Sequence, residues 1–146
     1  MLSLQSKYRT HTCGELSAKN VGETVTLSGW VHRKRDHGSL LFIDLRDNYG
    51  ITQIVLDGGN DDLERVRPES VLQVTGKVVA RDASQVNEKI PTGEIEISVE
   101  SWNVLTNAET LPFQVFGDDE TSEELLYKYR FLDLRRERLH YNILMR

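Results

Sequence analysis

The chain is 146 residues long and carries 18 Lys and Arg against 23 Asp and Glu, a formal net charge of −5. With 38% hydrophobic and 28% charged residues, it is too apolar for a disordered chain, and no stretch reaches the ~18 apolar residues of a membrane-spanning helix. The acidic balance argues against indiscriminate coating of nucleic acid but leaves room for a local basic patch.

The N-terminal residues give no sign of targeting or metal binding. Residues 1–11 alternate polar and apolar side chains and lack the apolar core of a secretory signal. Cys13 is the only cysteine, and His11 nearby has no second pair of ligands with which to form a zinc site. We therefore expect a cytoplasmic protein with no membrane segment and no bound metal.

Five strands are predicted in the first hundred residues, because β-forming side chains alternate there with a period of two. In the second strand, for example, Leu41, Ile43 and Leu45 share one face. Gly76, in the fourth strand, is expected to mark a bend of the kind that barrel corners need. The predicted strands are Thr24–Arg33, Leu40–Arg46, Ile51–Leu56, Val71–Arg81 and Glu94–Leu105.

A short helix is predicted between the third and fourth strands. Asn60 is a suitable N-cap for residues 61–67, and Pro68 would end the helix. Five strands with a helix in this position is the element order of an OB-fold, an all-β barrel whose nucleic-acid face is centred on strands two and three. An SH3-like barrel or a small sandwich would also fit the strand count.

Beyond residue 105 the sequence predicts a linker and helices instead of strands. We expect an OB domain over residues 1–105, a linker over residues 106–120 and a helical segment over residues 121–146. Thr121, with Glu124 three residues later, predicts a capping box at the start of a helix. A second helical pattern, Leu134–Arg146, reaches the end of the chain without a capping residue, which suggests a piece of a longer protein.

No catalytic motif is present, so we predict no active site within these residues. A binding surface has better support. Phe42 falls on the strand face opposite Leu41, where its ring would stack on an unpaired base, unless the two faces are exchanged and the ring is in the core, or a loop covers the ring. Gln53, on the neighbouring strand, carries an amide able to read a base edge, although a solvent-facing edge residue fits the pattern equally well.

Charged residues flank the same face. The basic run Arg33–Arg35 falls at the loop between the first two strands, where cations would meet phosphates and arginine could also fork to a base. Glu96 points outward from the fifth strand, and a carboxylate can accept both Watson–Crick-edge donors of guanine. Since a carboxylate otherwise repels RNA, Glu96 is best interpreted as a specificity element.

Several segments together resemble the N-terminal region of bacterial-type aspartyl-tRNA synthetases. They are GWVHRKRDHGSLLFIDLRDNYGITQIV (29–55), VTGKVVARD (74–82), PTGEIEI (91–97) and KYRFLDLRR (128–136). The resemblance implies an anticodon-binding OB domain followed by a linker to a class II catalytic domain. It implies that the parent enzyme is a homodimer that joins aspartate to tRNA-Asp with ATP and Mg²⁺, and that this piece binds RNA without catalysing a reaction.

The resemblance also implies roles for individual residues. Phe42 would stack on the central uracil of the anticodon, with Arg35 and Gln53 hydrogen-bonding to that base. Glu96 would read the first-position guanine or its modified form. The remaining implied contacts, to the RNA backbone or loop, are Arg33, Arg67, Arg81 and Asn87.

His37 departs from the commoner pattern of this family, which has Leu at the matching position. In the family, His there accompanies relaxed enzymes that also charge tRNA-Asn, whose anticodon differs from that of tRNA-Asp at the third base. The resemblance therefore implies that His37 accommodates either U or C at that base, although a solvent-exposed loop histidine would look the same in the sequence.

Two other functions remain compatible with the residues alone. The first is a free-standing domain that binds single-stranded nucleic acid through the same face without choosing a sequence. The second is an interaction domain whose helical tail docks a partner and whose strand face is inert. Base dependence and salt dependence of RNA binding separate these functions from anticodon reading.

Overall fold

The computed structural model describes residues 6–117 and 119–146. Residues 1–5 of the segment inspected for a targeting signal, and residue 118 of the predicted linker, lie outside the described residues. The chain divides into two compact units, residues 1–108 and residues 109–146.

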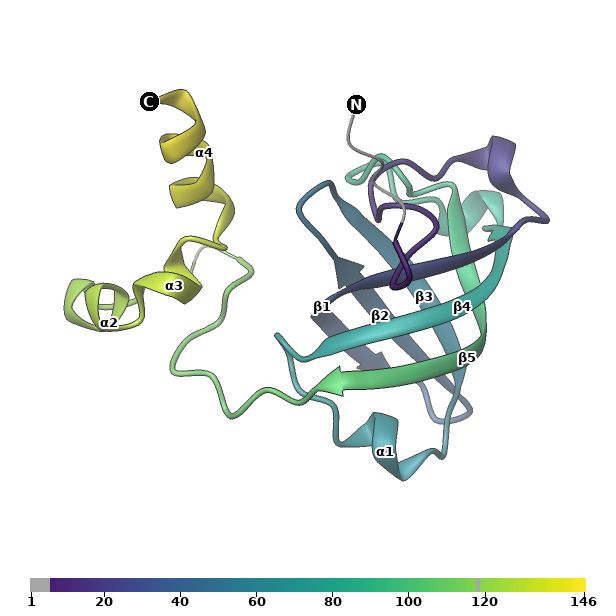
Figure 1. The fold of residues 1–146 in the computed structure, drawn as a ribbon, viewed down its shortest axis with the longest axis horizontal. Helices are drawn as coiled ribbons and strands as arrows, with labels where there is room; N and C mark the ends of the chain where they lie inside the picture. Colours follow the sequence, from purple (N-terminus) through teal and green to yellow (C-terminus); the bar gives the residue numbers. More distant parts are fainter. Residues whose placement is uncertain (1–5, 118) are drawn as a thin grey trace. The chain divides into compact units, whose positions relative to one another are not determined.

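The first unit is a closed five-stranded barrel with the strand order β1-β2-β3-β5-β4 (Figure 1). Strands β3 and β5 pair in parallel, and the other neighbours pair antiparallel. A short helix, α1 (Asp61–Glu64), lies between β3 and β4 at one end of the barrel, so the predicted OB-fold is confirmed. The strands are β1 (Thr24–Asp36), β2 (Leu40–Arg46), β3 (Ile51–Asp57), β4 (Val71–Ala80) and β5 (Ile95–Thr106).

Side-chain alternation in β2 separates the core from the outer face. Leu41, Ile43 and Leu45 are at most 2% exposed and belong to the main core. Because successive side chains of a strand point to opposite faces, the intervening Phe42 and Asp44 lie on the outside of the barrel and are half-buried. The pairing of β2 with β1 and β3 extends this outer face over three strands.

Register shifts interrupt the strand pairing at three places. The pairing of β4 with β5 shifts between Val71 and Leu72 and again between Thr75 and Gly76. The second shift falls where the bend was predicted, and a side chain at Gly76 would collide with the backbone of Ser98. In β1 the register with β2 shifts between Val31 and Arg33. Such bulges increase local twist and turn strands at barrel corners.

Helix α1 is held by a cation from β1. The Asn60 side chain accepts a hydrogen bond from the backbone N of Asp62 and caps the helix as predicted, but the helix ends at Glu64 rather than at residue 67. Lys34 Nζ donates to the carbonyl oxygens of Glu64 and Val66 at 2.6 and 2.8 Å. The Lys34 ammonium thus satisfies carbonyls that the end of a helix leaves without partners.

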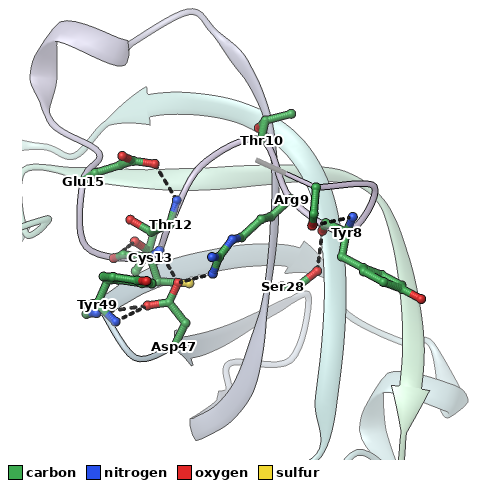
Figure 2. Close-up of polar contacts among 12 residues, drawn as sticks. Tyr8, Arg9, Thr10, Thr12, Cys13, Glu15, Ser28, Asp47 and Tyr49 are labelled. Carbon is green, nitrogen blue, oxygen red and sulfur yellow. Dashed lines mark hydrogen bonds and ion pairs between the residues drawn. The ribbon is translucent and has the colours of Figure 1, made fainter. Parts of the chain in front are cut away.

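The N-terminal segment is fastened to the turn between β2 and β3 (Figure 2). Asp47 accepts from the backbone N of Cys13 at 2.8 Å, and its other oxygen accepts from the backbone N of Tyr49 at 2.7 Å within the turn. Arg9 lies 3.8 Å from the same carboxylate and over the Tyr49 ring. Cys13 itself is fully buried, and burial together with Asp47 raises the pKa of its thiol above the usual range.

The second unit has a small core of its own. Phe113, Val115 and Leu132 are buried together, so part of the segment predicted as a linker packs against helices. The cap of the first helix is Ser122, whose hydroxyl accepts from the backbone N of Leu125 at 3.4 Å; the predicted cap at Thr121 is therefore wrong by one residue. The helices are α2 (Glu123–Lys128), α3 (Arg130–Asp133) and α4 (Glu137–Met145).

Short 3₁₀ turns complete the secondary structure: η1 (Ala18–Asn20) precedes β1, and η2 (Ala83–Gln85) lies in the loop between β4 and β5. Within the described residues, no helix is long and apolar enough to cross a membrane.

The Lys34 contact gives a stability test. Replacement of Lys34 by Met removes two charge-assisted hydrogen bonds and leaves two carbonyls unpaired, so the free energy of unfolding should fall by about 1.5–3 kcal/mol. Urea denaturation followed by circular dichroism measures the change. Lys77→Met, at an exposed position in β4, is the control and should change stability by no more than about 0.5 kcal/mol. Equal midpoints for the two variants would contradict this role of Lys34.

Candidate nucleic-acid interface

The Phe42 ring lies on the outer face of β2, outside both hydrophobic cores. It is half-buried, and the His37 ring from the β1–β2 hairpin packs against it edge-on, with centroids 5.2 Å apart. His37 is itself exposed. The alternative interpretation, in which Phe42 is a core residue, is wrong. His37 of the hairpin thus covers part of the ring, which remains partly exposed on the outer face.

Beside Phe42, five side chains form a polar row across the barrel. Arg35 Nη2 donates to Asp44 Oδ1 at 3.2 Å and to Gln53 Oε1 at 2.9 Å. Gln53 Nε2 then donates to Glu96 Oε2 at 2.8 Å, and Arg81 Nε lies 3.9 Å from that oxygen. The polar row takes one residue from each of β1, β2, β3 and β5, and the residue that follows β4: Arg35, Asp44, Gln53, Glu96 and Arg81.

Two members of the polar row, Gln53 and Arg81, are buried more deeply than the others. Gln53 is 7% exposed, and the Arg81 side chain is 5% exposed. Arg81 Nε donates to the carbonyl of Ile95, and burial lowers the pKa of the Arg81 guanidinium while Glu96 opposes that shift. The Asp44 and Glu96 side chains remain 19% and 20% exposed, so both carboxylates are within reach of a ligand on this face.

Two buried polar atoms of the polar row lack a hydrogen-bond partner, Arg35 Nε and Arg81 Nη2. A buried donor without a partner is costly in a folded protein and calls for an explanation. Arg35 pairs directly opposite Phe42 in the ladder of β1 and β2. Its side chain is 38% exposed although Nε itself is buried, so the guanidinium shares the outer face with the ring.

The other three predicted contacts are Arg33, Arg67 and Asn87. Arg33 is exposed and pairs in register with Asp44, while Arg67 is exposed in the segment that leads to β4. That segment joins β1 through Ser70, whose carbonyl accepts from the backbone N of Val31. Asn87 lies in the loop between β4 and β5, where its side-chain oxygen accepts from the backbone N of Lys89 at 3.0 Å.

Two cations on this side of the barrel have structural duties. The basic run Arg33–Arg35 lies in β1 rather than in the loop. Within this run, Lys34 donates to a carbonyl at the end of α1, so the expected contact of this lysine with phosphate is wrong. Arg46 donates to the buried Glu69 at 2.7 Å and to His32 Nδ1 at 2.8 Å. Burial, followed by Arg46, lowers the pKa of His32, in keeping with a neutral ring that accepts.

Sequence reasoning missed Asp44 as a member of the site. The alternation of side chains in β2, which puts Asp44 on the same strand face as Phe42, was the available signal, but its partner Arg35 comes from another strand. The pairing depends on the bulge in β1, which brings Arg35 rather than Lys34 opposite Phe42. No period-two pattern predicts such a shift. Among the described residues, no group of acidic, His or Cys side chains is arranged to hold a metal ion.

Comparison with known proteins agrees with this geometry. The family described as an OB-fold nucleic acid binding domain matches residues 25–105, and the chain belongs to that family. Its sequence is 58% identical over 142 residues to the aspartate–tRNA(Asp/Asn) ligase of Caulobacter sp. (strain K31), covering 95% of this chain and 23% of the relative. The corresponding protein of Pelagibacter ubique is 52% identical over 144 residues, covering 97% of this chain and 24% of the relative.

Two solved structures have the same fold as this chain. The asparaginyl-tRNA synthetase of Pyrococcus horikoshii superposes with a TM-score of 0.70 at 30% identity, over 86% of this chain and 29% of that one. The aspartyl-tRNA synthetase of Entamoeba histolytica shares the fold with a TM-score of 0.76, over 86% of this chain and 32% of that one. The chain thus spans about a quarter of the length of the curated relatives that it matches.

The position of Phe42 outside the core predicts a small effect on stability. Phe42→Ala should lower the free energy of unfolding by about 1 kcal/mol or less, because little buried contact is lost. Ile43→Ala, one residue along and fully buried, should cost about 2–5 kcal/mol. Thermal or urea unfolding of the two variants measures the difference. A loss as large for Phe42→Ala as for Ile43→Ala would place the ring in the core.

Proposed function

We propose that this chain is the anticodon-reading part of an aspartate–tRNA ligase and that it binds the anticodon loop of tRNA-Asp through Phe42 and the polar row. One observation carries the proposal: a half-buried aromatic ring on the outer face of β2 lies beside a hydrogen-bonded row of guanidinium, amide and carboxylate groups. Stacking on such a ring contributes ~1–3 kcal/mol per base, and the amide and guanidinium supply the hydrogen bonds that choose the base.

Each predicted contact has a place in this proposal. The central uracil stacks on Phe42 and meets Arg35 and Gln53 at its edge. Glu96, on the far side of Gln53, accepts from the first-position guanine. The exposed Arg33 and Arg67, together with Asn87 in the β4–β5 loop, contact the RNA backbone and loop, and Arg81 acts at the buried end of the polar row.

The similarity to the aspartate–tRNA(Asp/Asn) ligases supports a wider proposal for the whole protein. We propose that it is a cytoplasmic homodimeric class II synthetase that charges tRNA-Asp with aspartate, using ATP and Mg²⁺. The region matched here contributes tRNA binding rather than chemistry. The names of these relatives also support a second substrate, tRNA-Asn.

His37 is the residue that we propose accommodates the third anticodon base of tRNA-Asn. Its imidazole lies at the tip of the β1–β2 hairpin against Phe42, next to the ring on which the central base would stack. A histidine has a donor and an acceptor and can therefore satisfy either C or U at the neighbouring position. An aliphatic side chain there would offer no hydrogen bond to either base.

Binding of an anticodon stem-loop by the 146-residue chain tests the main proposal. Phe42→Ala should weaken binding of the tRNA-Asp stem-loop by ~1–3 kcal/mol, because the stacking surface is lost while the fold is kept. Replacement of the central uracil by another base should also weaken binding of the unchanged protein. Fluorescence anisotropy measures both effects, and unchanged affinity in both experiments would contradict the proposal.

Dependence on the loop sequence, rather than on salt, separates this function from sequence-tolerant binding of single strands. About three phosphate contacts predict that the logarithm of the binding constant falls with the logarithm of salt concentration at a slope near −2. A sequence-tolerant binder would show a similar slope but would bind scrambled loops equally well. Equal affinity for scrambled loops would favour that alternative, and absence of RNA binding would favour an interaction domain.

The role of His37 has its own test. His37→Leu should weaken binding of the tRNA-Asn stem-loop by about 1 kcal/mol, the net value of one hydrogen bond, and should affect the tRNA-Asp stem-loop less. The ratio of the two dissociation constants, measured at one salt concentration, reports the change. His37→Gln, which keeps a donor and an acceptor, is the matched control and should preserve most of the wild-type ratio. An unchanged ratio in His37→Leu would exclude this role.

A further inference from the structure

The polar row contains two carboxylates, which only accept hydrogen bonds, and two guanidinium groups, which only donate them. A neutral amide lies between these charged groups. Asp44 and Glu96, when ionised, only accept hydrogen bonds, whereas Arg35 and Arg81 only donate. Gln53 lies between Arg35 and Glu96 and has one end of each kind. Its orientation therefore follows from the charges of its neighbours.

Only one orientation of the Gln53 amide satisfies both neighbours. The oxygen faces the guanidinium of Arg35 at 2.9 Å, and the nitrogen faces the carboxylate of Glu96 at 2.8 Å. A rotation of the amide by 180° would place its NH₂ against the Arg35 cation and its oxygen against the Glu96 anion. Both hydrogen bonds would become repulsive contacts, and Gln53 is too buried, at 7% exposure, for water to replace them.

The residues at the two ends of the polar row hold the charged groups of Arg35 and Glu96 in place. Asp44 accepts from Arg35 Nη2 at 3.2 Å on one side, and Arg81, itself fixed to the Ile95 carbonyl, lies 3.9 Å from Glu96 on the other. The five side chains thus form a continuous alternation of donor and acceptor. Reversal of the central amide would break this alternation.

We infer that Asp44, Glu96 and Arg81 are positioning residues that hold the Gln53 amide in the orientation that selects uracil over cytosine at the central anticodon position. This inference rests on the proposed function. Read along the row, Arg35, Gln53 Oε1 and Gln53 Nε2 present a donor, an acceptor and a donor. One lone pair of the amide oxygen and one amide hydrogen remain for a ligand, and the Arg35 side chain, which is 38% exposed, brings its guanidinium donors to the same face.

This pattern matches the pairing edge of one pyrimidine. Uracil presents an acceptor, a donor and an acceptor through O4, N3–H and O2, which complements the order on the protein. Cytosine presents an acceptor, an acceptor and a donor through O2, N3 and N4. It would complement the protein only with the Gln53 amide reversed, so residues that prevent the reversal exclude cytosine without contacting the central base.

The experiment compares two stem-loops that differ only in the central anticodon base, U or C. For the wild-type chain we expect the U loop to bind about 10–100-fold more tightly. Glu96→Gln keeps the shape but offers either a donor or an acceptor to Gln53, so the preference should fall to about threefold or less. Because both RNAs carry the same first base, any loss of its contact with Glu96 cancels in the ratio.

Two further variants complete the design. Asp44→Asn loosens the opposite end of the row and should lower the preference in the same direction. Arg67→Met, at an exposed position off the row, is the control and should weaken both loops equally, leaving the ratio unchanged. Circular dichroism establishes that each variant is folded.

The orientation can also be observed in the wild-type chain without RNA. In an NMR spectrum, the Gln53 side-chain amide proton that is hydrogen-bonded to Glu96 should exchange slowly with solvent, and its exchange should become faster in Glu96→Gln. Rapid exchange of both Gln53 side-chain amide protons in the wild type would overturn the inference. A wild-type chain with no preference for U would overturn the proposed function, whereas a preference that survives in both Glu96→Gln and Asp44→Asn would overturn the positioning role alone.

Discussion

The alternation of side chains along β2 is the constraint on which the candidate RNA-binding surface depends. Because Leu41, Ile43 and Leu45 point into the barrel core, the residues between them point outward. Phe42 is thereby kept out of the core although it is among the most apolar side chains, and Asp44 is placed where it can hold Arg35. A slip of one residue in this strand would exchange the two sets and abolish both the core and the binding face.

The closed barrel gives the polar row its rigidity. Its members come from β1, β2, β3, β5 and the end of β4, so every strand contributes a fixed point. A site built on strands is held more precisely than one built on loops. The loops contribute His37, at the β1–β2 hairpin, and Asn87, between β4 and β5. Loop positions suit residues whose side chains must adjust to different RNA partners.

Much of this arrangement could be predicted from the sequence, because strand alternation is a local property. The five strands, the outward direction of Phe42 and the cap at Asn60 all follow from side chains within a few residues of one another. What could not be predicted depends on contacts between distant segments. The bulge in β1 turns Lys34 towards α1 and Arg35 towards Gln53, and neither partner lies close enough in sequence to be identified. The packing of Phe113 and Val115 with Leu132 was missed for the same reason.

The central claim is that the Phe42 ring carries a stacked uracil, and ¹⁹F NMR tests it most directly. An anticodon stem-loop with 5-fluorouridine at the central position is titrated with the 146-residue chain. A base stacked on the ring should show a ring-current shift of its fluorine resonance on binding, and Phe42→Leu, which keeps an apolar side chain of similar bulk, should abolish that shift. A fluorine resonance that moves equally with the wild-type and Phe42→Leu chains would contradict the account.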